Sequence, residues 1–190
     1  MTVGILITAA GKSRRFQLAG GQGNKLNSDL GGQTVFEITL QNAIKSQLPI
    51  HVITRPDNQG VITHCLQHNV PYSLINSEGL GETIAFGVKN TAHWDGWLIQ
   101  LADMPYITEN IFIRVANELK LHPLVRPIHD GKPGHPVGIS AQYRQQLIAL
   151  TGDDGAKSIL QGSAIYRIEM NNSCVINDID YPIKNESAGH

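Results

Sequence analysis

The sequence is poor in the features that mark several classes of protein. Charged side chains make up 16% and aromatic side chains 6% of its 190 residues, and the formal net charge is −1. This composition argues against a nucleic-acid-binding protein, because such proteins have a clear basic excess. No apolar run approaches the roughly 20 residues of a transmembrane helix, and no basic and apolar leader opens the chain. We therefore expect a cytoplasmic protein with neither a membrane nor a nucleic-acid partner.

Cysteine is also scarce. Cys65 and Cys174 are far apart in the sequence and each lies beside apolar residues, so two reduced, packed thiols are favoured over a disulfide or a metal pair. The apolar content of 41% allows one good core in a chain of this length, and no stretch resembles a linker between two cores. The prediction is a single domain over residues 1–182, followed by a tail over residues 183–190.

Short apolar runs alternate with amphipathic segments along most of the chain. Thr34 and Glu37 have the spacing of a capping box, which predicts a helix that continues to Lys45. Strands are predicted over residues 3–10, 50–54, 72–75, 97–101, 124–128 and 165–168. Strands separated by helices indicate an α/β fold with a mainly parallel sheet, in which ligands bind at the carboxyl ends of the strands.

A long irregular stretch follows the first predicted strand. About twenty residues show neither helical nor strand periodicity, but they contain four glycines and four cations: Gly11, Gly20, Gly21, Gly23, Lys12, Arg14, Arg15 and Lys25. Glycines let backbone amides approach a ligand and fixed cations neutralise it, so the composition suits a nucleoside triphosphate. It is not a Walker A loop, because position 6, where that motif needs glycine, is Leu6. A solvated basic loop is the alternative.

The residues ITAAGKSRRF, followed by Lys25 and Leu26, resemble the L-x-A-A-G-x-S-x-R-M…K-L signature of a nucleotidyltransferase family that includes the molybdenum cofactor cytidylyltransferases. Thr8 and Phe16 replace the usual Leu and Met. The resemblance implies a Rossmann-like three-layer α/β/α fold, with Arg15 and Lys25 as catalytic cations. It also implies a nucleotide site that includes Ala9, Ala10, Gly11, Ser13, Arg15 and Lys25.

The segment Gly79-Leu80-Gly81-Glu82-Thr83 is similar to a second family segment, G-x-G-x-S. The resemblance adds Gly79, Gly81 and Thr83 to the nucleotide site. A plain helix entry is the alternative interpretation of these residues.

Asp103 directly follows an apolar predicted strand. Because Thr108 is the better cap for the next helix, Asp103 is free to bind magnesium, which takes few carboxylates and completes its shell with phosphate oxygens and water. The residues Ala102-Asp103-Met104-Pro105 resemble the family's G-D-M-P motif, whose Asp binds metal. Asp180 in the C-terminal Asp-Ile-Asp segment would be the second ligand by the same resemblance; a solvated acidic tail is the alternative.

A later stretch, residues 126–138, resembles the R-P-x-x-x-G-x-x-G-H-P-V segment of molybdenum cofactor cytidylyltransferases, and residues 152–157 resemble their G-D-x-G-A-R. This resemblance implies an acceptor site made by Arg126, Gly134, His135 and Pro136. For His135, a purely structural role in a turn is the alternative.

Together these features predict a nucleotidyltransferase in which an acceptor phosphate attacks the α-phosphorus of a nucleoside triphosphate in line and expels pyrophosphate, with Mg²⁺ as the cofactor. The Ala9-Ala10-Gly11 segment looks like the cytidylyl branch, which implies CTP as donor, a molybdopterin-type acceptor and a molybdoenzyme that receives the product. Guanylyl transfer, a sugar or polyol phosphate acceptor, and a binding module without turnover remain alternatives.

Overall fold

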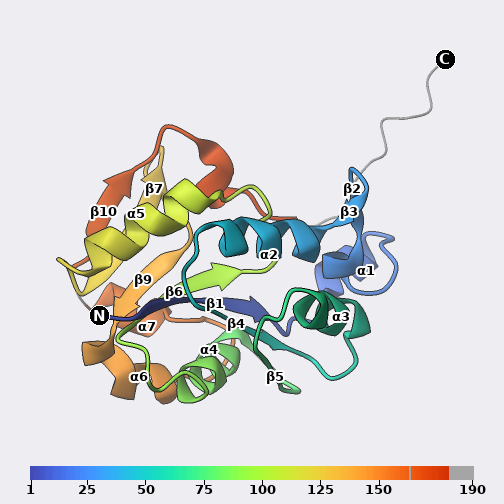
Figure 1. The fold of residues 1–190 in the computed structure, drawn as a ribbon, viewed down its shortest axis with the longest axis horizontal. Helices are drawn as coiled ribbons and strands as arrows, with labels where there is room; N and C mark the ends of the chain where they lie inside the picture. The colour runs from blue at the N-terminus through green and yellow to red at the C-terminus, as the bar shows by residue number, and fades with distance from the viewer. Residues whose placement is uncertain (163, 180–190) are drawn as a thin grey trace.

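The computed structural model of the protein describes residues 1–162 and 164–179, and within them eight strands form one central sheet (Figure 1). The strand order is β10-β7-β9-β6-β1-β4-β5, with β8 paired to β7 outside this path. These strands are β1 (Val3–Ala9), β4 (Ile50–Thr54), β5 (Tyr72–Leu74), β6 (Gly96–Leu101), β7 (Leu124–His129), β8 (Lys132–Pro133), β9 (Val137–Ser140) and β10 (Tyr166–Glu169). A separate small hairpin pairs β2 (Asp29–Leu30) with β3 (Gln33–Thr34).

The sheet is mainly parallel, as predicted. β1 pairs in parallel with β4 and β6, β4 with β5, and β10 with β7, whereas β9 is antiparallel to both β6 and β7. The sequence interpretation missed β9 and the turn that leads to it. Asp130 and Gly131 have φ angles of 48° and 73°, which is the turn for which Asp-Gly between two strands is a strong signal.

Seven α-helices are present in the described part of the chain. They are α1 (Arg14–Leu18), α2 (Val35–Lys45), α3 (Gln59–Gln67), α4 (Leu80–Lys89), α5 (Glu109–Leu119), α6 (Arg144–Ile148) and α7 (Lys157–Gln161). The Thr34 side chain accepts a hydrogen bond from the Glu37 amide at 3.0 Å, which confirms the predicted start of α2. Thr108 precedes α5, but its side chain makes no capping hydrogen bond.

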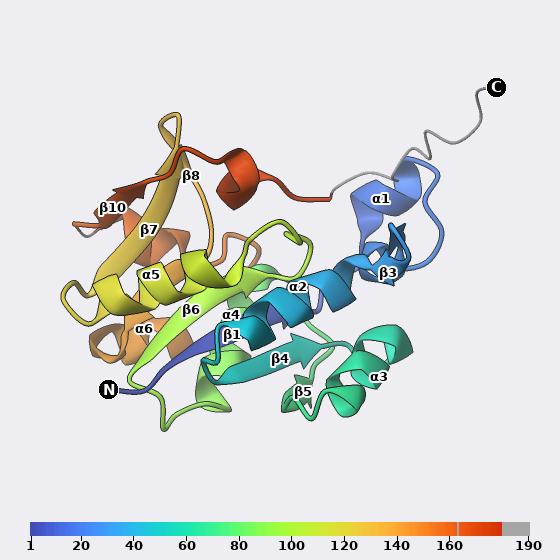
Figure 2. The same cartoon turned by 45° about the horizontal axis from the view of Figure 1, so that its top comes forward.

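The helices cover both faces of the sheet and make two apolar cores (Figures 1 and 2). Alternate residues of β1 serve the two cores: Ile5 and Ile7 pack with α2, α3 and α5, whereas Leu6 packs with α4, α6 and α7. The three-layer α/β/α arrangement is therefore confirmed. It brings the carboxyl ends of β1, β5 and β6 to one edge of the sheet, where the predicted site residues follow.

The last described segment returns to this edge. After β10 the chain forms a 3₁₀ turn, η3 (Ser173–Ile176), and the Ile179 amide donates to the Asp103 carbonyl at 2.9 Å. Asp180 and the predicted tail lie outside the described residues, so the domain boundary stays a prediction. None of the described helices is long and apolar enough to span a membrane.

Candidate active site

The loop after β1 folds back on itself through polar contacts. Ser13 has a left-handed backbone with φ of 56° and precedes α1, while its hydroxyl accepts a hydrogen bond from the Lys25 amide at 3.0 Å. The Asn24 side chain donates to the Gly11 carbonyl and accepts from the Leu26 amide, each at 3.1 Å. The expectation of a loop without helix was wrong for residues 14–18, because a helix of five residues is too short to show a period.

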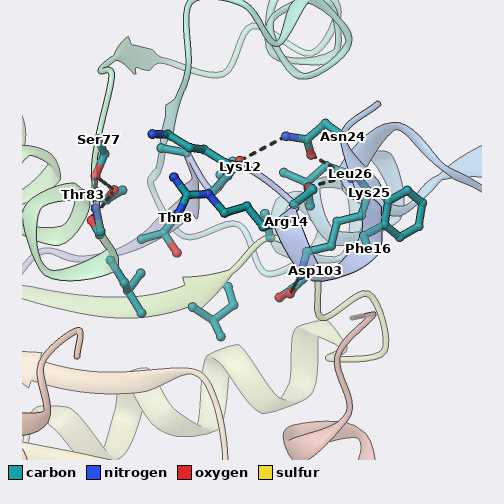
Figure 3. A pocket seen from close by; sticks show the side chains of 18 of the residues that line it. Thr8, Lys12, Arg14, Phe16, Asn24, Lys25, Leu26, Ser77, Thr83 and Asp103 are labelled. Carbon is teal, nitrogen blue, oxygen red and sulfur yellow. Dashed lines mark hydrogen bonds and ion pairs between the residues drawn. The ribbon is translucent and has the colours of Figure 1, made fainter. Parts of the chain in front are cut away.

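This loop forms one wall of a cavity of about 420 Å³. The turn after β5 and the end of β6 form the other walls, and Figure 3 shows Ser77 and Thr83 on one side of the cavity with Lys25 and Asp103 on another. The predicted residues that line it are Ala9, Ala10, Gly11, Ser13, Arg15, Lys25, Gly79, Thr83 and Asp103. The fold therefore brings together most of the predicted nucleotide site.

Lys25 and Asp103 form an ion pair inside this cavity. Lys25 Nζ lies 2.6 Å from Asp103 Oδ2, and the two side chains are only 18% and 13% exposed. Partial removal from water strengthens such a pair relative to one on the surface. Lys25 comes from the 3₁₀ turn η1 (Lys25–Asn27) and Asp103 from the end of β6, so two segments far apart in the sequence hold the centre of the cavity.

Two further cations reach into the same cavity. Lys12 Nζ bonds to Glu78 Oε2 at 3.1 Å. This hydrogen bond, and then the charge of Lys12, lower the pKa of Glu78, with a smaller effect from the charge of Arg14. Figure 3 shows the Lys12 and Arg14 side chains extending from the opening loop toward the Ser77 and Thr83 side. The sequence marked these cations as part of a basic loop but did not include them in the nucleotide site.

The turn after β5 is held by its own hydroxyl groups. Ser77 Oγ donates to the Gly79 carbonyl at 2.6 Å, and Thr83 Oγ1 donates to Ser77 Oγ at 2.7 Å. A Cβ on Gly79 would lie 2.3 Å from the Gly152 carbonyl oxygen, and one on Gly81 would lie 2.5 Å from that of Thr151. Close approach of residues 151–153 thus explains both glycines, and Gly81 does not line the cavity.

A second cavity, of about 460 Å³, adjoins the first and shares Leu80 and Leu101 with it. Among the predicted acceptor residues, Arg126 and His135 line it, and Gly134 and Pro136 do not. Lys157 of α7 also lines it and was not predicted.

Backbone contacts explain the residues around His135. Arg126 Nε donates to the Gly134 carbonyl at 3.0 Å, and the His135 amide donates to the Val175 carbonyl at 2.9 Å. A Cβ on Gly134 would lie 2.5 Å from that same Val175 oxygen. Glycine is therefore needed here so that the segment between β8 and β9 can pack against η3.

The Arg126 and His135 side chains are both largely removed from water, and this changes their proton affinity. Burial lowers the pKa of Arg126 from its usual value. Burial, and then the charge of Arg126, lower the pKa of His135 to about 3. The imidazole is therefore neutral near neutral pH, with one nitrogen that donates and one that accepts a hydrogen bond.

Comparison with known proteins explains this arrangement. Residues 5–169 match the family model of the MobA-like NTP transferase domain. The chain belongs to this family. It is 28% identical over 186 residues to the molybdenum cofactor cytidylyltransferase of Escherichia coli (strain K12), a match that covers 93% of this chain and 90% of that protein. The predicted family is thereby confirmed, and this MobA-like protein is a nucleotidyltransferase.

Solved structures share this fold. Rv0371c from Mycobacterium tuberculosis H37Rv superimposes with a TM-score of 0.82 at 17% identity, covering 95% of this chain and 94% of that one. A nucleotidyl transferase from Methanothermobacter thermautotroptrophicus gives a TM-score of 0.78 at 19% identity, covering 95% and 92%. Rv0371c has also been solved in complex with manganese, a structure that superimposes with a TM-score of 0.75 at 15% identity over 90% of this chain and 89% of that one.

Proposed function

We propose that this MobA-like nucleotidyltransferase transfers CMP from CTP to the molybdopterin cofactor and releases pyrophosphate. The observation that carries the proposal is the pair of adjoining cavities, one lined by four cations of the opening loop and one by Arg126 and His135. A nucleotide in the first cavity and an acceptor in the second would meet at their shared wall. The identity with the Escherichia coli cytidylyltransferase over most of both chains supports CTP and this acceptor.

The carboxylate of Asp103 fits a magnesium ion. It lies at the end of β6 among cations suited to phosphate, and magnesium typically combines one or two carboxylates with phosphate oxygens and water. Asp103 would hold the ion, together with Asp180. When bound, the ion supplies positive charge to the phosphate oxygens around the reacting phosphorus. The manganese complex of Rv0371c supports a divalent ion in this fold.

Lys25 has a role that follows from its position. Its ammonium already lies beside Asp103, so it would neutralise the triphosphate next to the ion and then the departing pyrophosphate, as Arg15 would from the start of the same loop. A fixed charge of this kind is worth about 2.7–4 kcal/mol in the transition state. The backbone and hydroxyl groups of the opening loop and the turn after β5 would orient the nucleotide, which is the main contribution of a protein to this reaction.

The second cavity would hold the acceptor phosphate and pterin. Arg126 and Lys157 are the cations that line this cavity and could bind an anion there. Neutral His135 can donate or accept a hydrogen bond without a change of charge. Most side chains that line the second cavity are apolar, and a bound acceptor would displace water from them that would otherwise compete as nucleophile.

A pyrophosphate assay tests the proposal directly. Purified protein with CTP, Mg²⁺ and reduced molybdopterin cofactor should release pyrophosphate, and it should not do so when the acceptor is left out. Replacing CTP with GTP should lower kcat/KM by at least about tenfold, which corresponds to about 1.4 kcal/mol of discrimination. Faster turnover with GTP, or with a sugar or polyol phosphate in place of the cofactor, would refute the specific assignment while leaving the nucleotidyltransferase family intact.

A further inference from the structure

Three side chains that commonly bind transition metals face one another between α2 and α3. One carboxylate oxygen of Glu37 and one ring nitrogen each of His64 and His68 lie within 4.8 Å of one another. None of the three lines either cavity of the nucleotidyltransferase site. They therefore form a cluster apart from the nucleotidyltransferase site, and the transfer reaction gives these three residues no role.

The fold fixes the positions of these side chains. His64 and His68 are four residues apart, with His64 in the last turn of α3 and His68 at its C-cap, so they project from one face of that helix. Glu37 lies in the first turn of α2, where its amide bonds to the Thr34 hydroxyl. The helices are neighbours (Figures 1 and 2), and the Phe36 and His64 ring centroids are 6.3 Å apart.

The polar atoms of the cluster are poorly satisfied by the rest of the protein. His64 Nε2 has a long contact of 3.4 Å to Thr34 Oγ1, and His64 Nδ1 is buried without a hydrogen-bond partner among the described residues. Glu37 Oε1 receives a long contact of 3.5 Å from Gln41 Nε2. Buried polar atoms are normally bonded, so the His64 imidazole has hydrogen-bonding or ligand capacity that the described residues do not use.

We propose that Glu37, His64 and His68 bind one Zn²⁺-like ion, which fastens α3 to α2. Two imidazoles and a carboxylate suit zinc and its neighbours in the first transition series, whereas magnesium and calcium prefer oxygen ligands alone. Bonds of about 2.0–2.1 Å to zinc put tetrahedral ligand atoms about 3.3 Å apart. Small side-chain rotations would close the cluster to that size, and His68 is exposed and able to make them. Water would take the fourth position.

The ion would stabilise a region that supports the opening loop. α3 begins beside η1, the turn that contains Lys25: Asn27 Nδ2 donates to Asn58 Oδ1 at 2.9 Å, and a Cβ on Gly60 would lie 2.2 Å from Asn27 Oδ1. Because no ligand of the cluster lines a cavity, the ion has a structural role. The proposal therefore does not depend on which nucleotide or acceptor the enzyme uses.

Direct metal titration tests the site. The full-length protein is freed of metal with a chelator, and Zn²⁺ is titrated in competition with a chromophoric chelator in the presence of excess Mg²⁺, so that oxygen-ligand sites such as Asp103 do not contribute. We expect one Zn²⁺ per chain, and tetrahedral d–d absorption when Co²⁺ replaces it. His68→Gln and Glu37→Gln should each weaken binding at least about tenfold, since loss of a supporting residue alone costs 10–100-fold at metal sites.

His122→Gln is the matched control. His122 Nε2 lies 3.9 Å from Glu118 Oε2, which makes a histidine and carboxylate pair that lacks the second histidine. This variant should bind Zn²⁺ as the wild type does. Zinc should also raise the melting temperature of the wild type and of His122→Gln by several degrees, but not that of His68→Gln. Absence of stoichiometric binding to the wild type, or binding to folded His68→Gln with wild-type affinity, would overturn the proposal.

Discussion

The two cavities at the carboxyl edge of the sheet hold their positive charges in different ways. In the first, Lys12 and Lys25 already have carboxylate partners, Glu78 and Asp103. In the second, Arg126 bonds through Nε to a backbone carbonyl, and none of the described carboxylates forms an ion pair with it. The first cavity therefore contains lysines that can exchange their carboxylate partners for a ligand. The second contains Arg126, a cation that is fixed in place and partly dehydrated.

This difference fits the different tasks proposed for the two cavities. A lysine that exchanges a carboxylate for a phosphate gains only the difference between two similar interactions, so it can bind a triphosphate and still release pyrophosphate. A dehydrated cation attracts an anion more strongly, because the effective dielectric constant around it is lower. We expect turnover to respond mainly to changes of charge in the first cavity, where the nucleotide is proposed to bind. In the second cavity, proposed for the acceptor, we expect it to respond mainly to changes of burial and hydrogen bonding.

The largest effect should come from Asp103→Asn. An amide keeps the size of the side chain but cannot supply the negative charge that magnesium and Lys25 both need, so we expect kcat to fall by about 10²–10³. Circular dichroism should show an unchanged fold, and steady-state pyrophosphate release measures the loss.

Asp57→Asn is the control for that variant, because Asp57 is exposed, lines neither cavity and has no proposed role. It should change kcat by less than about threefold, within the small range of exposed charges. Wild-type turnover in Asp103→Asn with an unchanged magnesium requirement would remove Asp103 from the metal site.

Arg15→Lys should have the next largest effect. Lysine replaces a planar fork that can bind two phosphate oxygens with a point charge, so kcat/KM for CTP should fall by about tenfold or more. Arg14→Lys, one residue away in the same short helix, should change it by no more than about threefold. Equal losses in the two variants would mean that the family arginine has been matched to the wrong residue.

His135→Ala should affect the acceptor and spare the nucleotide. The imidazole lines the second cavity and not the first, so we expect KM for the cofactor acceptor to rise by up to about tenfold, the cost of a lost hydrogen bond of about 1 kcal/mol or slightly more. KM for CTP should stay within about twofold. Separate titrations of the two substrates measure this, and a defect confined to CTP would place His135 in the wrong half of the site.

Most residues predicted for the nucleotide site line the first cavity, whereas only two of the four predicted for the acceptor site line the second, and the reason is physical. β1 and β6 are short buried runs whose ends are marked by glycine or by Asp103, so each signal is local. The pairing of Lys25 with Asp103, which are 78 positions apart, depends on the order of strands in the sheet and has no local signal. Only the family resemblance placed both residues in one site beforehand.

The residues predicted for the acceptor site are likewise brought together by contacts between segments that are far apart in the sequence. β9 lies between β6 and β7 and runs antiparallel to both, and the only signal of this reversal in the sequence is the Asp130-Gly131 turn. The neutral state of His135 follows from its burial and from the charge of Arg126, and neither can be predicted from the spacing of residues in the sequence. The resemblance placed Gly79 and Gly81 in the nucleotide site but gave no sign that residues 151–153 pack against them.

The smallest expected effect is a dependence of stability on pH that comes from His135. Its pKa in the folded protein is lowered to about 3, against 6.5 for an unperturbed histidine, so between these values the unfolded chain binds a proton that the folded protein does not. Stability from this group is complete above about pH 6.5 and is lost as the pH falls toward 3, by at most about 1.4 kcal/mol per pH unit.

Denaturant unfolding of the wild type and His135→Gln at pH 6 and pH 4.5 measures the difference, since the carboxylates titrate alike in both proteins. The wild type should lose about 1–2 kcal/mol more than the variant over this interval. Parallel losses would mean that His135 is solvated and able to take up a proton, and the second cavity would then share the exchangeable charge of the first.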